Sequence, residues 1–420
     1  MKPNELIAKI ENSELDKSFK KVYVSDSAVE EQKPRYIRTI KEFINLFGDD
    51  RDVFVLSAPG RTEVCGNHTD HNNGKVLAAS INLDAIAIAA KRDDMKINEK
   101  SEGHGLNEVD ISTLSPDEAE YGRSSSMIKG VAAGLKEKGY EIGGFDACTT
   151  SDVMGGSGLS SSAAFEVLIA TVINHLYNDG KIDAVTVAKA AQFSENVYFG
   201  KPSGLLDQMA SSVGTFVTID FKDTANPVIK KVDFDFAKSG YSLCIVDTHG
   251  NHSDLTDDYA AVRGEMEAVA KAMGKNVLRE VEYEEFFQSL DVLKEKVNDR
   301  ALLRAFHFFG ENERVENNDF DSFKQAITES GYSSFLYNQN VYSPKNPTEQ
   351  KLSLALCISE KLLNGKGAWR VHGGGFAGTI QAFVPNDMLD AYKETINRVF
   401  GDGSCHVLII RPVGGARVID

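Results

Sequence analysis

A run of small residues, DVMGGSGLSSSAA from Asp152 to Ala164, precedes a long apolar stretch. Gly155, Gly156 and Gly158 let the backbone turn tightly and approach a ligand, because glycine has no Cβ. A helix that begins at the serines would aim free N–H groups and the positive end of its dipole at the turn, which suits phosphate. A flexible turn with a serine cap is the alternative, but a cap needs only one serine. The length of the run favours a phosphate-binding loop that is not of the Walker A type, because no GK[ST] follows.

A second candidate segment, APGRTEVCGNHTDHNNGKVL from Ala58 to Leu77, is dense in polar side chains between two expected strands. Arg61, His68, Asp70 and His71 could give directional hydrogen bonds to a hydroxyl-rich ligand. A metal site is the first alternative, but no third well-spaced ligand group is nearby. A solvated loop is the second alternative, and it would be preferred if the segment stood alone.

A third segment, GAWRVHGGGFAG from Gly367 to Gly378, places three consecutive glycines between apolar stretches. Consecutive glycines cost backbone entropy, so they indicate close approach of backbone or ligand. A glycine-rich bulge or turn is the alternative.

The composition limits the class of protein. The chain has 420 residues and a formal net charge of -16, which argues against a nucleic-acid-binding surface. The first residues lack the apolar core of a signal peptide, and no apolar run reaches the roughly 20 residues that span a bilayer. The five cysteines form no CxxC pair. We expect a cytoplasmic protein with no membrane, nucleic-acid or protein partner.

The elements that position these segments alternate irregularly. Strands are expected at DVFVLSAPG, KVLAASI, LDAIAIAAK, FDACTTSD, TFVTIDF, YSLCIVDT, GTIQAFV and CHVLIIRP, and VIKKVDFDF is a further strand-like run. Apolar spacing predicts helices near 37–44, 126–138, 163–179, 184–199, 255–273, 283–295, 299–309 and 349–364, with Asp183 as one cap. Without a regular βαβ rhythm the fold class is α+β, and we place a domain boundary between 1–222 and 223–420.

Together the three segments resemble the signature motifs of the GHMP kinases, and specifically of the galactokinases. GRTEVCGNHTDHNNG is similar to GRxNxxGEHxDYxxG, GGSGLSSSAA to GxGLSSSAA, and GGGFAG to GGGFGG. SENVYFGKPSGLLDQMAS and VDTHGNHSDLTDDYAAVR also match family segments, in the family's order. The similarity covers roughly residues 45–415. The resemblance implies two domains, an N-terminal mixed sheet with helices and a C-terminal α/β sandwich, with ATP and sugar bound between them.

The resemblance also implies an activity: transfer of the ATP γ-phosphoryl group to the anomeric hydroxyl of a sugar. Asp207 would stand beside the C1 hydroxyl, and Arg61 would neutralise charge and keep Asp207 ionised. Ser162 and Glu195 would hold Mg²⁺. Asn67, His68, Thr69, Asp70 and Tyr259 would bind the sugar. The nucleotide would be bound by Gly156, Ser157, Gly158, Leu159, Ser160, Ser161 and Ser162.

Departures from the family pattern bear on the substrate. Asn67 stands where the family has a glutamate associated with the sugar's C6 hydroxyl, and Glu63 stands where it has an asparagine. A neutral amide at 67 would relieve repulsion of a C6 carboxylate and could donate to it, which raises galacturonate as an alternative. Glu63 could restore the charge from another position, so galactose remains the first choice.

Two rival classes remain open. One is a kinase of the same superfamily for galacturonate, N-acetylgalactosamine, arabinose or mevalonate, and Asp70 in the sugar-type motif argues against mevalonate. The other is a catalytically silent galactose sensor with this fold. The intact serine loop and the presence of Arg61, Glu195 and Asp207 favour an enzyme.

Overall fold

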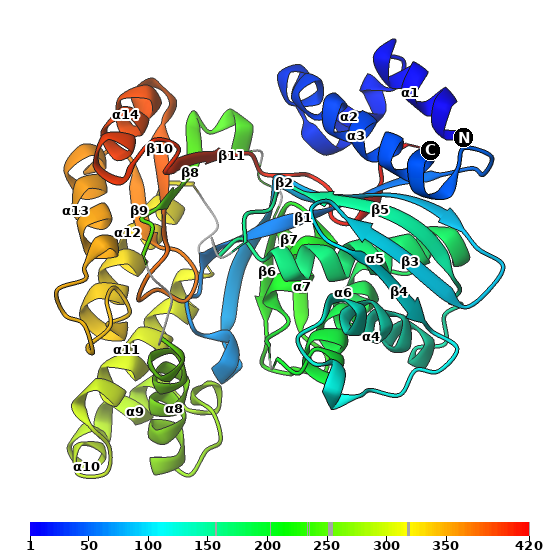
Figure 1. Ribbon diagram of the computed structural model, residues 1–420. Coiled ribbons are helices and arrows are strands. Elements are labelled where there is room, and N and C mark those ends of the chain that lie inside the picture. The colour runs from blue at the N-terminus through cyan, green and yellow to red at the C-terminus, as the bar shows by residue number, and fades with distance from the viewer. Residues whose placement is uncertain are drawn as a thin grey trace.

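The structure is a computed structural model that describes residues 1–155, 158–201, 203–232, 234, 236–250, 255–316 and 320–419. Two lobes stand side by side, each built on its own sheet (Figure 1). No helix within the described ranges is both long and apolar enough to cross a membrane.

The first lobe contains an 8-stranded sheet in which the path β12-β1-β2-β5-β3-β4 is extended by β6 and β7, paired along the first part of β2. Its strands are β1 Phe54–Cys65, β2 Lys75–Lys91, β3 Lys96–Ser101, β4 Leu106–Asp110, β5 Phe145–Ser151, β6 Phe216–Asp220, β7 Val228–Val232 and β12 Ala416–Arg417. The long pair β1 and β2 forms the centre of this sheet.

Helices cover both faces of this sheet (Figure 1). On one face lie α4 Ser124–Glu137, α5 Ser161–Tyr177, α6 Ala184–Phe193 and α7 Leu206–Val213; on the other lie α1 Pro3–Glu11, α2 Asp16–Tyr23 and α3 Asp26–Phe47. Strand β2 shows why both faces are filled. Ala87 and Ala89 pack in the core under α4 and α5, whereas Ile86 and Ile88 pack under α3, because successive side chains of a strand point to opposite faces.

The second lobe has a 4-stranded antiparallel sheet in the order β11-β8-β10-β9. Its strands are β8 Tyr241–Asp247, β9 Ala368–Val371, β10 Thr379–Pro385 and β11 Cys405–Leu408. Its helices are α8 Thr256–Ala272, α9 Tyr283–Gln288, α10 Leu290–Lys294, α11 Asp299–Arg314, α12 Phe320–Ser333, α13 Lys351–Leu363 and α14 Leu389–Phe400. Helices α8 to α11 share a separate apolar core at the end of this lobe (Figure 1).

Most expected elements are present. The α+β class is confirmed, because the chain forms two sheets, each covered by helices, without a regular βαβ order. Asp183 caps α6 as predicted, accepting from the backbone N–H groups of Val185 and Thr186. The expected end of the first strand near Gly60 is wrong, because β1 continues through the second motif to Cys65 with irregular pairing at Pro59/Arg61. Helices α12 and α14 and strands β3, β4 and β9 were not expected from the sequence.

The chain also crosses between the lobes more often than a single boundary allows. Strand β7 and strand β12 both lie beyond residue 222 yet belong to the 8-stranded sheet. The buried Arg411, near the end of the chain, bonds Asp84 at 3.0 Å and Ser57 at 2.7 Å in the first lobe. The division at 222 and 223 stays a prediction.

Candidate active site

Strand β1, the glycine-rich loop and helix α7 meet at one ion pair. Nε of Arg61, on β1, donates to Oδ1 of Asp207 at 2.7 Å. Nη1 of the same guanidinium donates to the carbonyl oxygen of Gly158. Asp207 lies in the first turn of α7. The structure therefore brings the two predicted catalytic residues into direct contact beside the loop.

Asp207 combines an ionised side chain with access to solvent. Burial alone would raise the pKa of Asp207, but the Arg61 guanidinium and the Ser160 hydroxyl hold that pKa below its ordinary value. Oγ of Ser160 donates to Oδ2 of Asp207, from a backbone with φ 58°, which non-glycine residues seldom adopt. The side chain of Asp207 is 36% exposed. A carboxylate in this setting can accept a proton from a ligand hydroxyl.

The glycine-rich loop leads directly into α5, whose first residue is Ser161. Ser160 precedes it, and the hydroxyl of Ser160 does not cap the first N–H groups of the helix. The carbonyl oxygen of Leu159 accepts from the N–H of Arg61 at 3.1 Å, which anchors the loop to β1. A helix N-terminus presented in this way suits phosphate. Gly156 and Ser157, also predicted to bind nucleotide, lie outside the described residues.

The two predicted magnesium ligands face each other. Oγ of Ser162 lies 3.5 Å from Oε1 of Glu195, which lies on the π-helical turn Ser194–Tyr198, a form common at functional sites. Nζ of Lys201 donates to the same Oε1 at 2.8 Å. A carboxylate that already binds an ammonium, beside a hydroxyl, offers the oxygen ligands that Mg²⁺ prefers, so Ser162 and Glu195 would suit that ion. No cluster of three or more His, Cys, Asp or Glu suited to a metal occurs in the described part of the chain.

Behind Glu195 lies a buried polar pair that was not expected from the sequence. Nε2 of Gln208 donates to Oε2 of Glu195 at 2.8 Å and to Oε2 of Glu166 at 3.1 Å. Burial, with the neighbouring Glu195, raises the pKa of Glu166 to about 9. Gln208 follows Asp207 directly on α7, so one helix turn supports both the carboxylate of the ion pair and the predicted metal ligand.

The second motif continues past β1 into a loop that lies beside Asp207. Asp70 opens the 3₁₀ turn Asp70–Asn72, and a Cβ at Gly204 would lie 2.5 Å from its Oδ2. Burial and the charges of Glu63 and Asp207 raise the pKa of Asp70 to about 6. Burial lowers the pKa of His68, and its Nε2 donates to the carbonyl oxygen of Gly374 at 2.9 Å.

Asn67 and Thr69 are buried, and their side chains are used by the protein itself. Nδ2 of Asn67 donates to Oε1 of Glu63 at 2.9 Å and to the carbonyl oxygen of Gly373 at 2.7 Å, and its Oδ1 accepts from Asn340 at 3.0 Å. The hydroxyl of Thr69 bonds backbone carbonyls of its own loop. Both side chains shape the loop, whereas His68 and Asp70 are partly exposed.

A buried ion pair lies beneath this loop. Nη2 of Arg370, on β9, donates to Oε1 of Glu63 at 2.8 Å, and the arginine is 0% exposed. Arg61 and Glu63 are two apart on β1, so a strand reading of the motif would have placed both on one face. That periodicity was the available signal for Glu63. Arg370, far along the chain, gave no signal in the sequence.

The third motif is the turn that carries the carbonyls named above. Gly375 has φ 79°, and a Cβ there would meet the carbonyl oxygen of Asn340. A Cβ at Gly374 would lie 2.5 Å from the ring of Tyr259, whose hydroxyl donates to the carbonyl oxygen of Gly375 at 3.0 Å. The glycines therefore let Asn340 and Tyr259 lie close to the backbone of this turn. The three consecutive glycines had indicated such a close approach.

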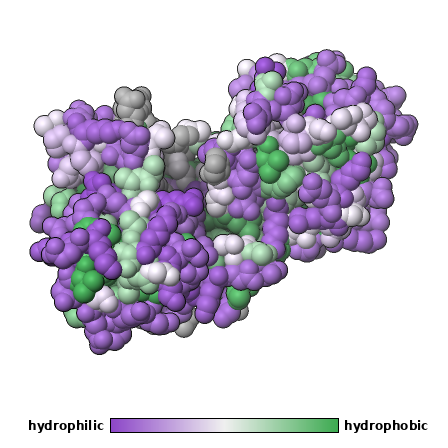
Figure 2. Space-filling view, turned by 90° about the horizontal axis from the view of Figure 1, so that it is seen from below, coloured by the Kyte–Doolittle hydropathy of each residue, from purple (hydrophilic) through white to green (hydrophobic). Residues whose placement is uncertain are grey.

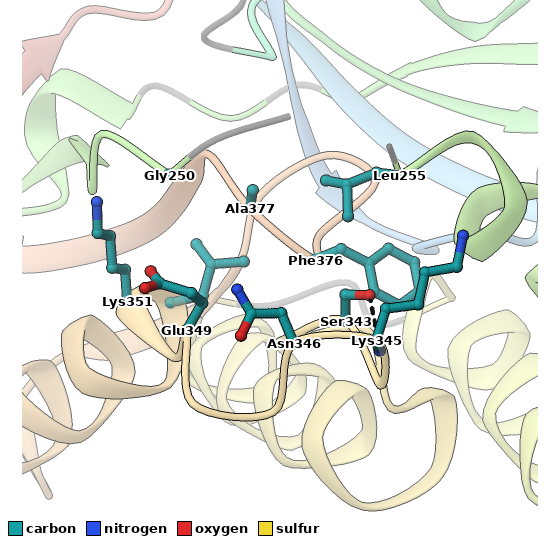
Figure 3. A pocket seen from close by; sticks show the side chains of 10 residues that line it. Gly250, Leu255, Ser343, Lys345, Asn346, Glu349, Lys351, Phe376 and Ala377 are labelled. Atoms are coloured by element: carbon teal, nitrogen blue, oxygen red, sulfur yellow. Dashed lines mark hydrogen bonds between the residues drawn. The ribbon is translucent and has the colours of Figure 1, made fainter. Parts of the chain in front are cut away.

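The surface is hollowed between the two lobes, as the view from below shows (Figure 2). A cavity of about 520 Å³ lies beside the third motif, with Phe376 and Ala377 on one side and Lys345, Asn346 and Glu349 on the other (Figure 3). Neither Arg61 nor Asp207 lines it. Charged side chains of both signs line this cavity, and none of the predicted sugar-binding residues lines it.

Comparison with known proteins agrees with this geometry. Residues 41–91 match the model of the galactokinase galactose-binding signature, and residues 126–215 match that of the GHMP kinases N terminal domain. The galactokinase of Streptomyces coelicolor is 31% identical over 389 residues, which is 90% of this chain and 97% of the relative. The galactokinase of Clostridium tetani is 31% identical over 376 residues, 86% of this chain and 92% of the relative.

Solved structures show the same fold. The galactokinase of Lactococcus lactis, crystallised with galactose, superposes with a TM-score of 0.76 at 26% identity, covering 90% of this chain and 98% of that one. A mevalonate kinase superposes with a TM-score of 0.59 at 14% identity and shares the fold. Given the motifs, the geometry and relatives this similar over most of their length, the chain belongs to the galactokinase family of GHMP kinases.

Proposed function

We propose that this protein is a galactokinase that transfers the γ-phosphoryl group of ATP to the C1 hydroxyl of galactose, giving galactose 1-phosphate. The observation that carries the proposal is the ion pair beside the glycine-rich loop, in which Nε of Arg61 lies 2.7 Å from Oδ1 of Asp207. The pair supports a carboxylate that is ionised, partly exposed and next to the position expected for phosphate. Family membership supports galactose as the sugar and ATP as the donor.

In this mechanism Asp207 orients the attacking hydroxyl and accepts its proton. Arg61 keeps Asp207 ionised and stabilises negative charge that spreads over the transferred phosphoryl oxygens. Ser160 fixes the second carboxylate oxygen, so Asp207 keeps a single orientation. Most of the rate enhancement in such a transfer comes from positioning and charge stabilisation, which these contacts support.

Ser162 and Glu195 would hold Mg²⁺, which when bound neutralises phosphate charge. The N-terminus of α5, with Gly158, Leu159, Ser160 and Ser161, would hold the phosphates of ATP. His68, Asp70 and Tyr259 would contact the sugar. Asn67 and Thr69 would act on the sugar through the loop that they shape, because their side chains are engaged within the protein. A cytoplasmic location is supported by the five free thiols.

The test is ADP release coupled to a reporter enzyme, with MgATP and a panel of galactose, galacturonate, N-acetylgalactosamine, arabinose and glucose. We expect turnover to be highest on galactose and to fall at least about 1,000-fold in Asp207→Ala, because proton transfer and orientation are lost together. Asp223→Ala, at an exposed turn, is the matched control and should keep full activity. Galactose binding without ADP release would instead identify a sensor, and turnover on another sugar alone would overturn the substrate.

A further inference from the structure

A single ammonium group occupies the position at Glu195 where the metal is expected. Nζ of Lys201 lies 2.8 Å from Oε1 of Glu195, the same oxygen that Ser162 faces at 3.5 Å. The backbone N–H of Lys201 also donates to the carbonyl oxygen of Glu195 at 3.0 Å, so the lysine follows the carboxylate in the fold. Lys201 is therefore built into the predicted metal site.

The two partners differ greatly in exposure. The side chain of Lys201 is 60% exposed, and that of Glu195 is 4% exposed. An ion pair with one long, solvated side chain is weak, with a net worth of about 0–1 kcal/mol. Glu195 is held on its other side by Gln208, so it stays in place if the lysine leaves. The geometry thus combines a buried, fixed anion with an exposed cation on a long side chain.

The phosphate loop itself supplies no cation. The segment from Asp152 to Ala164 contains no lysine or arginine. The guanidinium of Arg61 is committed to Asp207 and to the carbonyl of Gly158. ATP brings several negative charges to this loop, and Lys201 is an exposed cation beside the Ser162–Glu195 pair. An ammonium on a flexible stem can move from a carboxylate to a phosphate oxygen.

We propose that Lys201 has two positions: it neutralises Glu195 while the metal is absent, and it contacts a phosphate of ATP once the metal–nucleotide complex is bound. The proposal rests on the function proposed above, because it assumes that Ser162 and Glu195 hold the metal. In the first position Lys201 competes with divalent cations for Oε1 of Glu195. In the second it is a further catalytic residue, since it touches the nucleotide.

Two binding measurements on the purified full chain test the two positions separately. The first is Mn²⁺ binding to nucleotide-free protein, followed by the electron paramagnetic resonance signal of free Mn²⁺. The second is MgATP binding by calorimetry. Lys201→Met keeps the length of the side chain and removes its charge. Lys181→Met is the matched control, because Lys181 is 78% exposed and pairs only with Asp179 among the described residues.

We expect Lys201→Met to bind Mn²⁺ at least about threefold more tightly and MgATP at least about tenfold more weakly than the parent, with an unchanged melting temperature. Lys181→Met should match the parent in both. Unchanged or weaker Mn²⁺ binding would overturn the first position, and unchanged MgATP binding would overturn the second. Neither readout uses the sugar, so a parent protein that fails to phosphorylate galactose would refute the proposed function without deciding these outcomes.

Discussion

Glu63 and Asn67 stand where the family has an asparagine and a glutamate. The contact between these two side chains can be measured as an interaction energy. Asn67 and Glu63 are hydrogen-bonded at 2.9 Å, and Glu63 is the described carboxylate that pairs with the fully buried Arg370. Glu63→Gln leaves that guanidinium without its anion, which costs about 3–5 kcal/mol for a buried pair. Glu311 also faces Arg370 electrostatically, so we expect the lower end of that range.

The second single variant acts through repulsion. Asn67→Glu places a second carboxylate against Glu63, and two like charges about 4 Å apart repel by about 4 kcal/mol at an effective dielectric constant near 20. It also loses the hydrogen bond to the carbonyl oxygen of Gly373. The double variant Glu63→Gln with Asn67→Glu keeps one carboxylate and one amide in contact. We expect it to be more stable than the sum of the single changes by about 2 kcal/mol.

The assay is thermal unfolding by circular dichroism at a fixed scan rate, with all variants at one protein concentration. At about 2 °C per kcal/mol for a large domain, Glu63→Gln should lower the melting temperature by about 6 °C. Glu102→Gln is the control, because its pair with Arg38 is more than half exposed on both sides and should change the melting temperature by under about 2 °C. Additive single changes, or a Glu63→Gln shift no larger than the control, would refute this reasoning.

Three further predictions concern the loop that follows β1 and the glycine turn of the third motif. Because Nδ2 of Asn67 already donates to Glu63 and to Gly373, it has no hydrogen left for a C6 carboxylate. We therefore expect kcat/KM for galactose to exceed that for galacturonate at least about 100-fold, and equal values would contradict this. Asp70 has a folded-state pKa of about 6, above its unfolded value, so its cost to stability appears as pH rises from about 4 to 6 and then stays constant. Asp70→Asn should therefore melt higher than the parent at pH 7.5 but equally at pH 4, and galactose should raise its melting temperature less. Gly375→Ala should raise the KM for galactose more than Gly373→Ala, since both have positive φ but only the Cβ at 375 meets backbone; equal effects would show that strain alone matters.

Helices and buried strands were predictable where the apolar period was strong. The spacing in MIKGVAAGLKEKG indicates α4, and the apolar run after the serines indicates α5. The predicted first strand ends too early, near Gly60, because Gly60 and the polar side chains after it hide the alternation of apolar and polar residues. In the structure β1 continues to Cys65. Helix α14 carried a usable signal in Tyr392 and Ile396, which are four apart and buried.

The candidate site was predictable mainly through the family motifs. Nothing in the spacing of Arg61 and Asp207 says that they touch, because the contact depends on β1 and α7 packing together. The hydrogen bond from Asn67 to the carbonyl oxygen of Gly373 was also invisible, since it joins segments from both lobes. Long-range hydrogen bonds of this kind follow from tertiary packing, which local sequence does not encode.

Strand β12 has a consequence for how the chain is made in the cell. It pairs with β1, and Val418 and Ile419 complete the core beneath α1 to α3, so the first lobe closes on residues that are synthesised after every other described element. Until then the edge of β1 is unpaired and apolar surface under the first three helices is uncovered. A nascent chain in this state is open to aggregation and to binding by chaperones. The last piece of the sheet that carries Arg61 therefore leaves the ribosome after every other described element.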